Sequence, residues 1–410
     1  MGCSSSNQAR SSLPHLVIVG FQYGGYNLLH QVKDKFRVTV IDKKDFFEYV
    51  TGAPANIHQK GNFERISESY HNSLNIKKVF GSNVKFEQGL VTELVDTHNL
   101  RYTPTAGRKA GHPGSSTKKL RFDYLAICTG SVWSVNHPAE DVFNIFTSED
   151  KSEFYAKYRD EIDRAKSVLI VGGGPTGLEC AGEILIKYKG EKKLGIATNS
   201  SKLIEAYGDK ASEMAREHFE SKNVNLYFNT RYNPSHELAQ EYDYVLNCVG
   251  TKVLTPFMDK KFSSFKGDRG HIFINEYYQV TNTDPLTGRT SGSEEVLDNV
   301  FAFGDCSISK LNEPKNVPAA VTGALMVANN LIKSIDGDTK DFKTVPEQNF
   351  FISGVYFDDT AGAFVMGPDT NMNPNLYEDK KGYEPPVFTF LRDEPEGQKN
   401  YDGYIAMFTG

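Results

Sequence analysis

The sequence predicts an α/β protein with two Rossmann-like dinucleotide-binding domains, the second inserted in the first, plus a small C-terminal α+β region. Three observations support this prediction. Short apolar runs of strand length recur along the chain, helical patterns follow two of them directly, and a glycine-rich loop stands at both of these junctions. The runs are rich in Val, Leu and Ile, which is typical of parallel strands buried on both faces.

Composition limits the possible functions. The chain has 410 residues, 39% of them hydrophobic and 24% charged, and a net charge of −6. This length suggests two or three domains, and the absence of a basic run argues against nucleic acid as a partner. Five cysteines occur without a C-x-x-C motif, so we expect a reducing intracellular compartment, no metal site and no adjacent dithiol that relays electrons: Cys3, Cys128, Cys180, Cys248 and Cys306.

The N-terminus, Met1-Gly2-Cys3-Ser4-Ser5-Ser6, matches the pattern for N-myristoylation on Gly2. One acyl chain binds membranes only marginally, and Cys3 is placed to carry a second, palmitoyl chain. We therefore expect residues 1–12 to be a flexible acylated tether that holds the protein on the cytoplasmic face of a membrane. The alternative is a disordered start that carries Gly and Ser by chance.

The first glycine loop follows the apolar run 16–19 and contains Gly20, Gln22, Gly24 and Gly25. A helix is expected from there to about residue 33. The next strand, 38–41, ends at Asp42, which stands 22 residues after Gly20, where a ribose-binding carboxylate belongs. Gln22 replaces the middle glycine, and its side chain obstructs a pyrophosphate unless the loop shifts. A Rossmann-like unit without a ligand is the alternative.

Between the two loops, residues 84–91 and 123–128 read as strands, and the Gly-, Ser- and Lys-rich segment 103–119 reads as a hairpin or surface loop. The second of these strands ends at Thr129 and Gly130. A charged helical pattern, 148–166, leads to the second glycine loop.

The second loop is a complete G-x-G-x-x-G of Gly172, Gly174 and Gly177, which follows the run 168–171 and opens a helix. It begins 152 residues after Gly20, so the duplication has the size of a domain. Where an acid would select NAD, the strand 194–197 ends at Thr198, and Lys202 is close by. NADH and NADPH therefore both remain possible.

The rest of the chain repeats the pattern once more. The strand 244–249 ends at Gly250, as the earlier one ended at Gly130, and the run 299–303 ends at Gly304 and Asp305. A helix begins near Pro318 and runs to about residue 333. The tail beyond residue 342 is rich in Phe and Tyr, and we expect its aromatic residues to be core rather than a cover for a cofactor or a lipid contact.

Five segments together resemble the two-dinucleotide-binding-domain flavoproteins over about residues 13–335. They are GFQYGG with Asp42, ICTGS, VGGGPTGLE, NCVGT and FAFGDCS. The acylated start, DFFEYVTGA and ISGVYF are most similar to the family of apoptosis-inducing factor-like mitochondrion-associated proteins and ferroptosis suppressor proteins. The resemblance implies FAD in the first unit, NAD(P)H in the second, and a quinone as the small electron acceptor.

The resemblance also implies roles for individual residues. Gly20, Gln22, Gly24 and Gly25 form the FAD pyrophosphate loop, Asp42 holds the ribose, Val91 offers its backbone to adenine, and Asp305 binds the ribityl region. The helix that begins at Pro318 points its positive end at the flavin. Glu179, one turn into the second helix, is the candidate catalytic residue between flavin and nicotinamide; a partly exposed helix position is its alternative. The predicted cofactor-binding set is Gly20, Gln22, Gly24, Gly25, Asp42, Val91, Thr129, Gly130, Gly172, Gly174, Gly177, Thr198, Gly250, Gly304, Asp305 and Pro318.

We thus expect an FAD-binding domain of residues 13–147 and 255–335, an NAD(P)H-binding domain of residues 148–254 and a C-terminal region of residues 336–410. The expected activity is that of a membrane-anchored FAD-dependent NAD(P)H oxidoreductase that passes a hydride to FAD and electrons to a quinone. Two residues leave one alternative open. They are Gln22, and Ala55, which stands where relatives carry an arginine that contacts FAD. The alternative is a cofactor-poor, non-catalytic paralogue that acts as an interaction or NAD(P)H-sensing protein.

Overall fold

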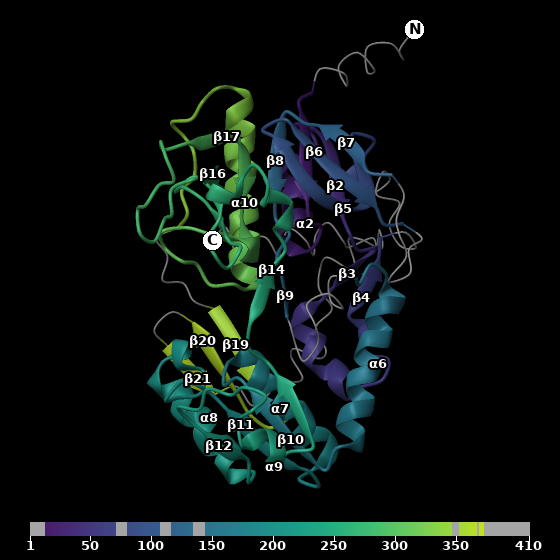
Figure 1. Ribbon diagram of the computed structural model, residues 1–410, viewed down its shortest axis with the longest axis vertical. Coiled ribbons are helices and arrows are strands. Elements are labelled where there is room, and N and C mark those ends of the chain that lie inside the picture. Colours follow the sequence, from purple (N-terminus) through teal and green to yellow (C-terminus); the bar gives the residue numbers. More distant parts are fainter. Residues whose placement is uncertain are drawn as a thin grey trace.

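The computed structural model describes residues 13–70, 80–106, 116–133, 144–346, 352–366 and 369–372. These residues form two lobes, each built on its own sheet, with a short two-stranded ribbon between them (Figure 1). The upper lobe of Figure 1 takes its strands from before and after the segment that builds the lower lobe. The predicted fold class, with one unit inserted in the other, is confirmed.

The upper sheet has eight strands, and its centre is parallel. Strands β8, β1 and β2 at this centre are short, apolar and almost entirely buried, as the Val- and Ile-rich runs predicted. In sheet order the strands are β16 (Gln279–Thr281), β17 (Val296–Ala302), β8 (Tyr124–Ile127), β1 (His15–Val19), β2 (Arg37–Asp42), β5 (Val84–Asp96), β6 (Asn99–Pro104) and β7 (Lys118–Arg121). β6 and β7 pair antiparallel, so the hairpin reading of residues 103–119 is confirmed for its described ends.

The lower sheet has four parallel strands: β12 (Asn225–Tyr227), β11 (Lys193–Ala197), β10 (Ser167–Val171) and β13 (Tyr244–Asn247). Helices α7 (Pro175–Tyr188) and α8 (Asp209–Ser221) share a hydrophobic core with it. A proline in its first turn favours the start of α7, because proline has no N–H to leave unpaired there. The short α9 (Leu238–Glu241) precedes β13.

Helices α2 (Tyr23–Val32) and α10 (Val317–Ile335) pack against each other and bury their apolar residues in the core of the upper sheet. α6 (Ser148–Arg164) runs along the side of the molecule from one lobe to the other (Figure 1). It starts with a capping box in which the Thr147 and Asp150 side chains bond each other's backbone N–H. Smaller elements are β3 (Phe46–Glu48), β4 (Ser67–Ser69), β15 (Ile272–Phe273), β18 (Ser307–Ile308), α3 (Asn62–Arg65), η1 (Val50–Ile57), η2 (Glu205–Tyr207), η3 (Pro256–Met258), η4 (Ser263–Phe265) and η5 (Gly304–Cys306).

Residues 352–372 of the C-terminal region, where described, form a three-stranded antiparallel sheet of β19 (Ile352–Tyr356), β20 (Gly362–Met366) and β21 (Asp369–Met372). It packs on α7 and α8, in the lower lobe of Figure 1. Tyr356 and Phe357 are almost completely buried there, so the expectation that the tail aromatics are core is confirmed for these two.

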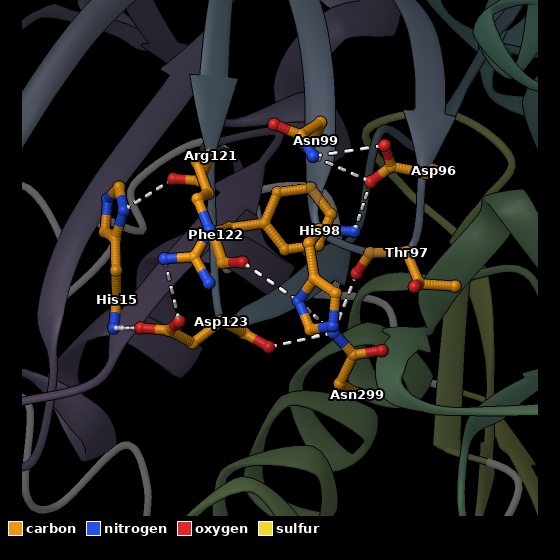
Figure 2. Close-up of polar contacts among 9 residues, drawn as sticks. All are labelled: His15, Asp96, Thr97, His98, Asn99, Arg121, Phe122, Asp123 and Asn299. Atoms are coloured by element: carbon orange, nitrogen blue, oxygen red, sulfur yellow. Dashed lines mark hydrogen bonds and ion pairs between the residues drawn. The ribbon is translucent and has the colours of Figure 1, made fainter.

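A polar network fixes the amino ends of the upper strands (Figure 2). The His15 N–H donates to Asp123 Oδ2 at 2.8 Å, and the His15 Nδ1 lies 2.8 Å from the Arg121 carbonyl oxygen. Asn299 Nδ2 donates to the Thr97 and Asp123 carbonyl oxygens, both at 2.8 Å. These bonds join β1, β8, β17 and the β5–β6 turn at the edge opposite the glycine loops, so we assign this network to the architecture.

Candidate dinucleotide-binding sites

Both glycine loops lie at the carboxyl ends of parallel strands, which is where open α/β sheets bind ligands. Gly20 and Gly172 adopt φ angles of +102° and +123°, a region that side chains rarely enter. A Cβ on Gly25 would overlap the Gly20 carbonyl oxygen, and a Cβ on Gly177 would overlap that of Gly172. The first and third glycines are therefore required by close packing of strand, loop and helix in both units.

The middle positions of the two loops differ in their side chain but hardly in their backbone. Gln22 has φ −91° and ψ −150°, and Gly174 has φ −84° and ψ 177°. A Cβ on Gly174 would meet no heavy atom within 4 Å among the described residues. The second loop therefore leaves open the space through which a pyrophosphate reaches the N-terminus of α7.

The Gln22 side chain is held against β3. Its Nε2 donates to the Phe46 carbonyl oxygen and to Tyr70 Oη, both at 2.9 Å, and its Oε1 accepts from the Glu48 N–H at 3.0 Å. Burial, and then the charges of Asp42 and Asp45, raise the pKa of Tyr70 well above its usual value. The protonated hydroxyl donates to the Phe21 carbonyl oxygen. The first loop thus has nearly the backbone shape of the second, and the Gln22 side chain is bonded to its own lobe.

Asp42 lies beside this loop at the end of β2, as predicted. It is buried, its Oδ2 accepts from the Phe21 N–H at 2.6 Å, and its Oδ1 accepts from the Lys44 N–H at 2.8 Å. Each carboxylate oxygen can accept a further bond, so both can still bind ribose hydroxyls. Burial, followed by the charge of Lys44, lowers the pKa of the neighbouring Lys43 to about 7. Val91 lies on the same edge, three residues along β5 from Gln88, the partner of Asp42 in the sheet.

The strand-end residues predicted for the first site come together. The Ser131 hydroxyl, which follows Thr129 and Gly130, donates to Asp305 Oδ2 at 2.8 Å. Gly304 has a φ of +75°, and a Cβ there would lie 3.6 Å from the Cβ of Ala320 in the first turn of α10. The N-terminus of this helix, which includes Pro318, is capped by Asn316, whose Oδ1 accepts from the Ala319 N–H at 3.0 Å. Gly24 is also required, because a Cβ there would lie 2.9 Å from the Phe303 ring.

A short ribbon connects the two predicted sites. β8 leads through Thr129 and Gly130 into β9 (Ser131–Trp133), and β13 leads through Gly250 into β14 (Thr251–Val253). β9 and β14 pair antiparallel between the lobes (Figure 1). The strands that leave the carboxyl ends of both sheets therefore meet in one ribbon.

Glu179 is buried, with 7% of its surface exposed, so the alternative of a partly exposed helix residue is wrong. One turn later on α7, Glu183 is also buried, and sequence reasoning did not single it out. Its Oε1 accepts from Tyr356 Oη at 2.6 Å, and its Oε2 lies 2.9 Å from His58 Nδ1. Burial, and then the charges of Glu179 and Glu183, raise the pKa of Tyr356 well above its usual value. The four-residue spacing of the glutamates on α7 was a usable signal. The partners of Glu183, which are His58 just after η1 and Tyr356 in β19, come from distant segments and were not visible.

Two cysteines near the glycine loops, Cys128 and Cys180, are poorly suited to thiol chemistry. A hydrogen bond with Cys248, and then burial, raise the pKa of Cys180 well above its usual value. Burial raises the pKa of Cys128 in the same way. Thiolates are the reactive form of cysteine, so these thiols are poor nucleophiles. In the described ranges, no cluster of His, Cys, Asp and Glu is arranged to hold a metal ion.

Both loops therefore fit a dinucleotide. The second offers an open cradle at Gly174, and the first keeps the same backbone path with Asp42 and Asp305 in place. Residues 14–324 match the sequence profile of the family described as pyridine nucleotide-disulphide oxidoreductase.

Two relatives of similar sequence agree with this family match. Apoptosis-inducing factor homolog B of Dictyostelium discoideum is 26% identical over 72% of this chain and 76% of its own length. Ferroptosis suppressor protein 1 of Xenopus laevis is 27% identical over 78% of this chain and 81% of its own length. These relatives confirm the family resemblance.

Solved structures share the fold. NDH2 of Plasmodium falciparum in complex with NADH superimposes with a TM-score of 0.68 at 15% identity and covers 94% of this chain and 98% of its own. The sulfide:quinone oxidoreductase of Aquifex aeolicus gives a TM-score of 0.69 at 17% identity over 93% of this chain and 92% of its own. At these identities the likeness establishes the fold.

Proposed function

The chain belongs to the pyridine nucleotide-disulphide oxidoreductase family, and from that membership we propose that it is a membrane-anchored oxidoreductase that uses NAD(P)H and FAD to reduce a quinone. Membership makes it an NAD(P)H-dependent flavoprotein oxidoreductase. The quinone, the membrane anchor and the role of each residue belong to the proposal.

One observation carries the proposal: two glycine loops of matching backbone shape, whose sheets end at a shared ribbon. A bound flavin supplies the group that accepts a hydride and releases electrons. The chain holds and orients it. Gly20 to Gly25, Asp42 and Asp305 would hold the flavin dinucleotide, and Gly172 to Gly177 would hold the hydride donor. The same proposal keeps residues 13–147 and 255–335 as the FAD-binding domain and 148–254 as the NAD(P)H-binding domain.

The properties of the cysteines favour a small electron acceptor over a disulfide substrate. The raised pKa values of Cys128 and Cys180 leave their sulfurs protonated, so neither is suited to attack a disulfide substrate. Among proteins with this fold, the sulfide:quinone oxidoreductase has a quinone in its name. We place Glu179 at the junction of the two ligands as the candidate catalytic residue.

The test of this function starts from the visible spectrum of the purified protein before and after incubation with FAD. We expect a flavin spectrum that NADH or NADPH bleaches and that a water-soluble quinone restores. The matched control is the FAD-loaded protein with quinone and no nucleotide. A protein that binds no flavin under any condition would contradict the proposal.

Membrane attachment rests on Gly2 and Cys3, which lie outside the described residues. No helix in the described ranges combines the length and apolar composition that a membrane crossing requires. We propose that two acyl chains provide the anchor. In cells, Gly2→Ala should move the protein from the membrane fraction to the supernatant, whereas the control Ser4→Ala should not. If both variants fractionate like the parent protein, the acyl anchor is refuted.

A further inference from the structure

The second dinucleotide site lacks the acid that commonly binds the adenosine ribose. In this fold the acid stands at the carboxyl end of the strand next to the glycine loop. Here that strand is β11, and the residue after it is Thr198. Thr198 is buried, and its Oγ1 accepts from the Ser200 N–H at 3.2 Å. The strand end itself therefore offers no carboxylate to a ribose.

The chain after β11 folds back onto the glycine loop. The Ile204 N–H donates to the Gly173 carbonyl oxygen at 2.7 Å, and a Cβ on Gly173 would lie 3.0 Å from the side chains of both Leu203 and Thr198. Ile204 has a φ of +37°, which is strained for a β-branched residue. This return brings Glu205, the first residue of η2, to the edge of the loop.

Glu205 meets the strand end through Ser200, because the Ser200 hydroxyl donates to the Glu205 carboxylate. Both side chains lie on the surface of this loop, and the carboxylate keeps lone pairs for further donors. An acid thus lies beside the end of β11 and next to the glycine loop, although it is seven residues away from the expected position.

The cation noted at this site is already paired. Lys202 Nζ lies 2.6 Å from Asp209 Oδ1, and that contact raises the pKa of Lys202. Two other cations lie nearby in the sequence of neighbouring segments. Lys210 follows Asp209 in α8, and Arg231 follows Thr230, whose N–H donates to the Thr198 carbonyl oxygen at 2.8 Å. A 2′-phosphate carries close to two negative charges at neutral pH. On this loop it would approach the Glu205 carboxylate, while the charge of Lys202 is offset by Asp209.

We propose that Glu205 binds the adenosine ribose hydroxyls of the nicotinamide dinucleotide and makes this chain select NADH over NADPH. This inference rests on the proposed function only in placing the nicotinamide dinucleotide at the second loop. It narrows the donor from both nucleotides to one, and it assigns the choice to a residue outside the glycine motif.

Direct binding tests the proposal. The dissociation constants of NADH and NADPH are measured by calorimetry on the FAD-loaded protein, and kcat/KM is measured for both with a quinone acceptor. We expect the parent protein to bind NADH roughly tenfold more tightly or better, as repulsion between charges a few ångströms apart at a solvated site implies. Glu205→Gln should bring the two constants together, and Glu205→Arg should reverse their order. The control Glu213→Gln, at an exposed acid on α8, should leave the ratio as in the parent.

Lys202→Ala tests whether Lys202 is committed to Asp209 or binds the 2′-phosphate of NADPH. If Lys202 is committed to Asp209, the variant binds NADPH about as weakly as the parent. A selective loss of NADPH binding in Lys202→Ala, equal affinities in the parent protein, or an unchanged ratio in Glu205→Gln would each overturn the proposal. If quinone reduction is absent while the binding preference is present, only the proposed function fails. If both nucleotides drive quinone reduction equally, only this inference fails.

Discussion

Gln22 and Gly174 hold the same place in two loops of the same shape, and the contrast between them isolates the effect of one side chain. The glutamine is bonded to Phe46, Glu48 and Tyr70, whereas the space beside Gly174 is open. Gln22 therefore has two physical effects: it anchors β3 to the loop, and it adds atoms near the N-terminus of α2.

Replacing Gln22 by glycine should separate these two effects. The loss of three hydrogen bonds should lower the free energy of unfolding by about 1–3 kcal/mol. FAD affinity should rise severalfold, because the pyrophosphate gains the approach that the second loop already offers. Urea unfolding measures the first effect and flavin fluorescence titration the second. Gln22→Ala, which removes the bonds but keeps a Cβ, is the matched control. Weaker FAD binding in Gln22→Gly would contradict this account.

Gly174 and Gly177 should respond differently to substitution although they are three residues apart. Gly174→Val adds a side chain to open space, so the protein should fold and keep its flavin while NADH binding falls at least tenfold, by loss of close phosphate approach. Gly177→Ala forces a Cβ into the Gly172 carbonyl oxygen, so it should destabilise the lower lobe by about 1–3 kcal/mol. Thermal unfolding and NADH titration of both variants provide the comparison. Loss of flavin from Gly174→Val would show that the two sites are assigned in the wrong order.

At the scale of elements, α7 connects the nucleotide loop, the buried glutamates and the C-terminal strands. Gly182 lies where the C-terminal strands cross this helix, and a Cβ there would overlap the Phe357 carbonyl oxygen. Gly182→Ala should therefore loosen these strands and lower the free energy of unfolding by about 1–3 kcal/mol. Limited proteolysis should then cut within residues 352–372 at protease concentrations that leave the parent intact. Lys187→Ala, on the outer part of the same helix, is the control. Equal resistance of both variants would refute the packing role of Gly182.

The turn between β19 and β20 is held to α8 by Asp358. Its Oδ2 lies 3.0 Å from His218 Nε2, and its Oδ1 accepts from the Thr360 N–H at 2.8 Å. Burial opposes ionisation, but the bonds from His218 and Thr360 hold the pKa of Asp358 well below its usual value. A depressed carboxyl pKa adds stability above the ordinary aspartate range of about 4, and this stability is lost as the pH falls toward the folded-state value.

Asp358→Asn should therefore destabilise the protein by about 2 kcal/mol at neutral pH, and by less as the pH falls below about 4, where the Asp358 carboxyl of the unfolded parent takes up a proton. Urea unfolding of both proteins across that pH range gives the difference directly. Asp359→Asn, at the adjacent acid, is the control. A difference that stays constant with pH would contradict the role of the charged form.

At the scale of the whole molecule, the first dinucleotide site is assembled from three separated parts of the chain. They are the β1–β2 region with Gly20 and Asp42, the end of β8 at Thr129, and the turn between β17 and α10 at Asp305. A ligand that touches all three stabilises every contact that holds them together, because it binds the folded chain and not the unfolded one.

Removing FAD should consequently lower the melting temperature of the entire protein. Added FAD should raise the free energy of unfolding by about 2.7 kcal/mol at a concentration one hundred times the dissociation constant. Differential scanning fluorimetry over a range of FAD concentrations measures the shift, with riboflavin, which lacks the pyrophosphate and adenosine, as the control. A melting temperature that FAD does not change would contradict the assembly of the site from these three parts.

The two glycine loops, the strands that precede them, Asp42 and the Gly304–Asp305 turn were predictable from the amino-acid sequence. Each of these is a local feature: a φ angle open to glycine, a run of β-branched residues, or a helix start, which a few neighbouring residues fix. The fold class followed from the same features because their order along the chain leaves few alternatives.

The side chains that reach these loops from other segments became apparent from the folded chain alone. Gln22 turns toward β3 because Phe46 and Tyr70 supply partners, Glu183 meets His58 and Tyr356 from two other segments, and Glu205 reaches Ser200 because the chain returns to Gly173. Such contacts depend on how distant segments pack, and no spacing within one segment encodes them. The loops were therefore predictable from the chain, whereas the residues that we expect to tune their ligands were not.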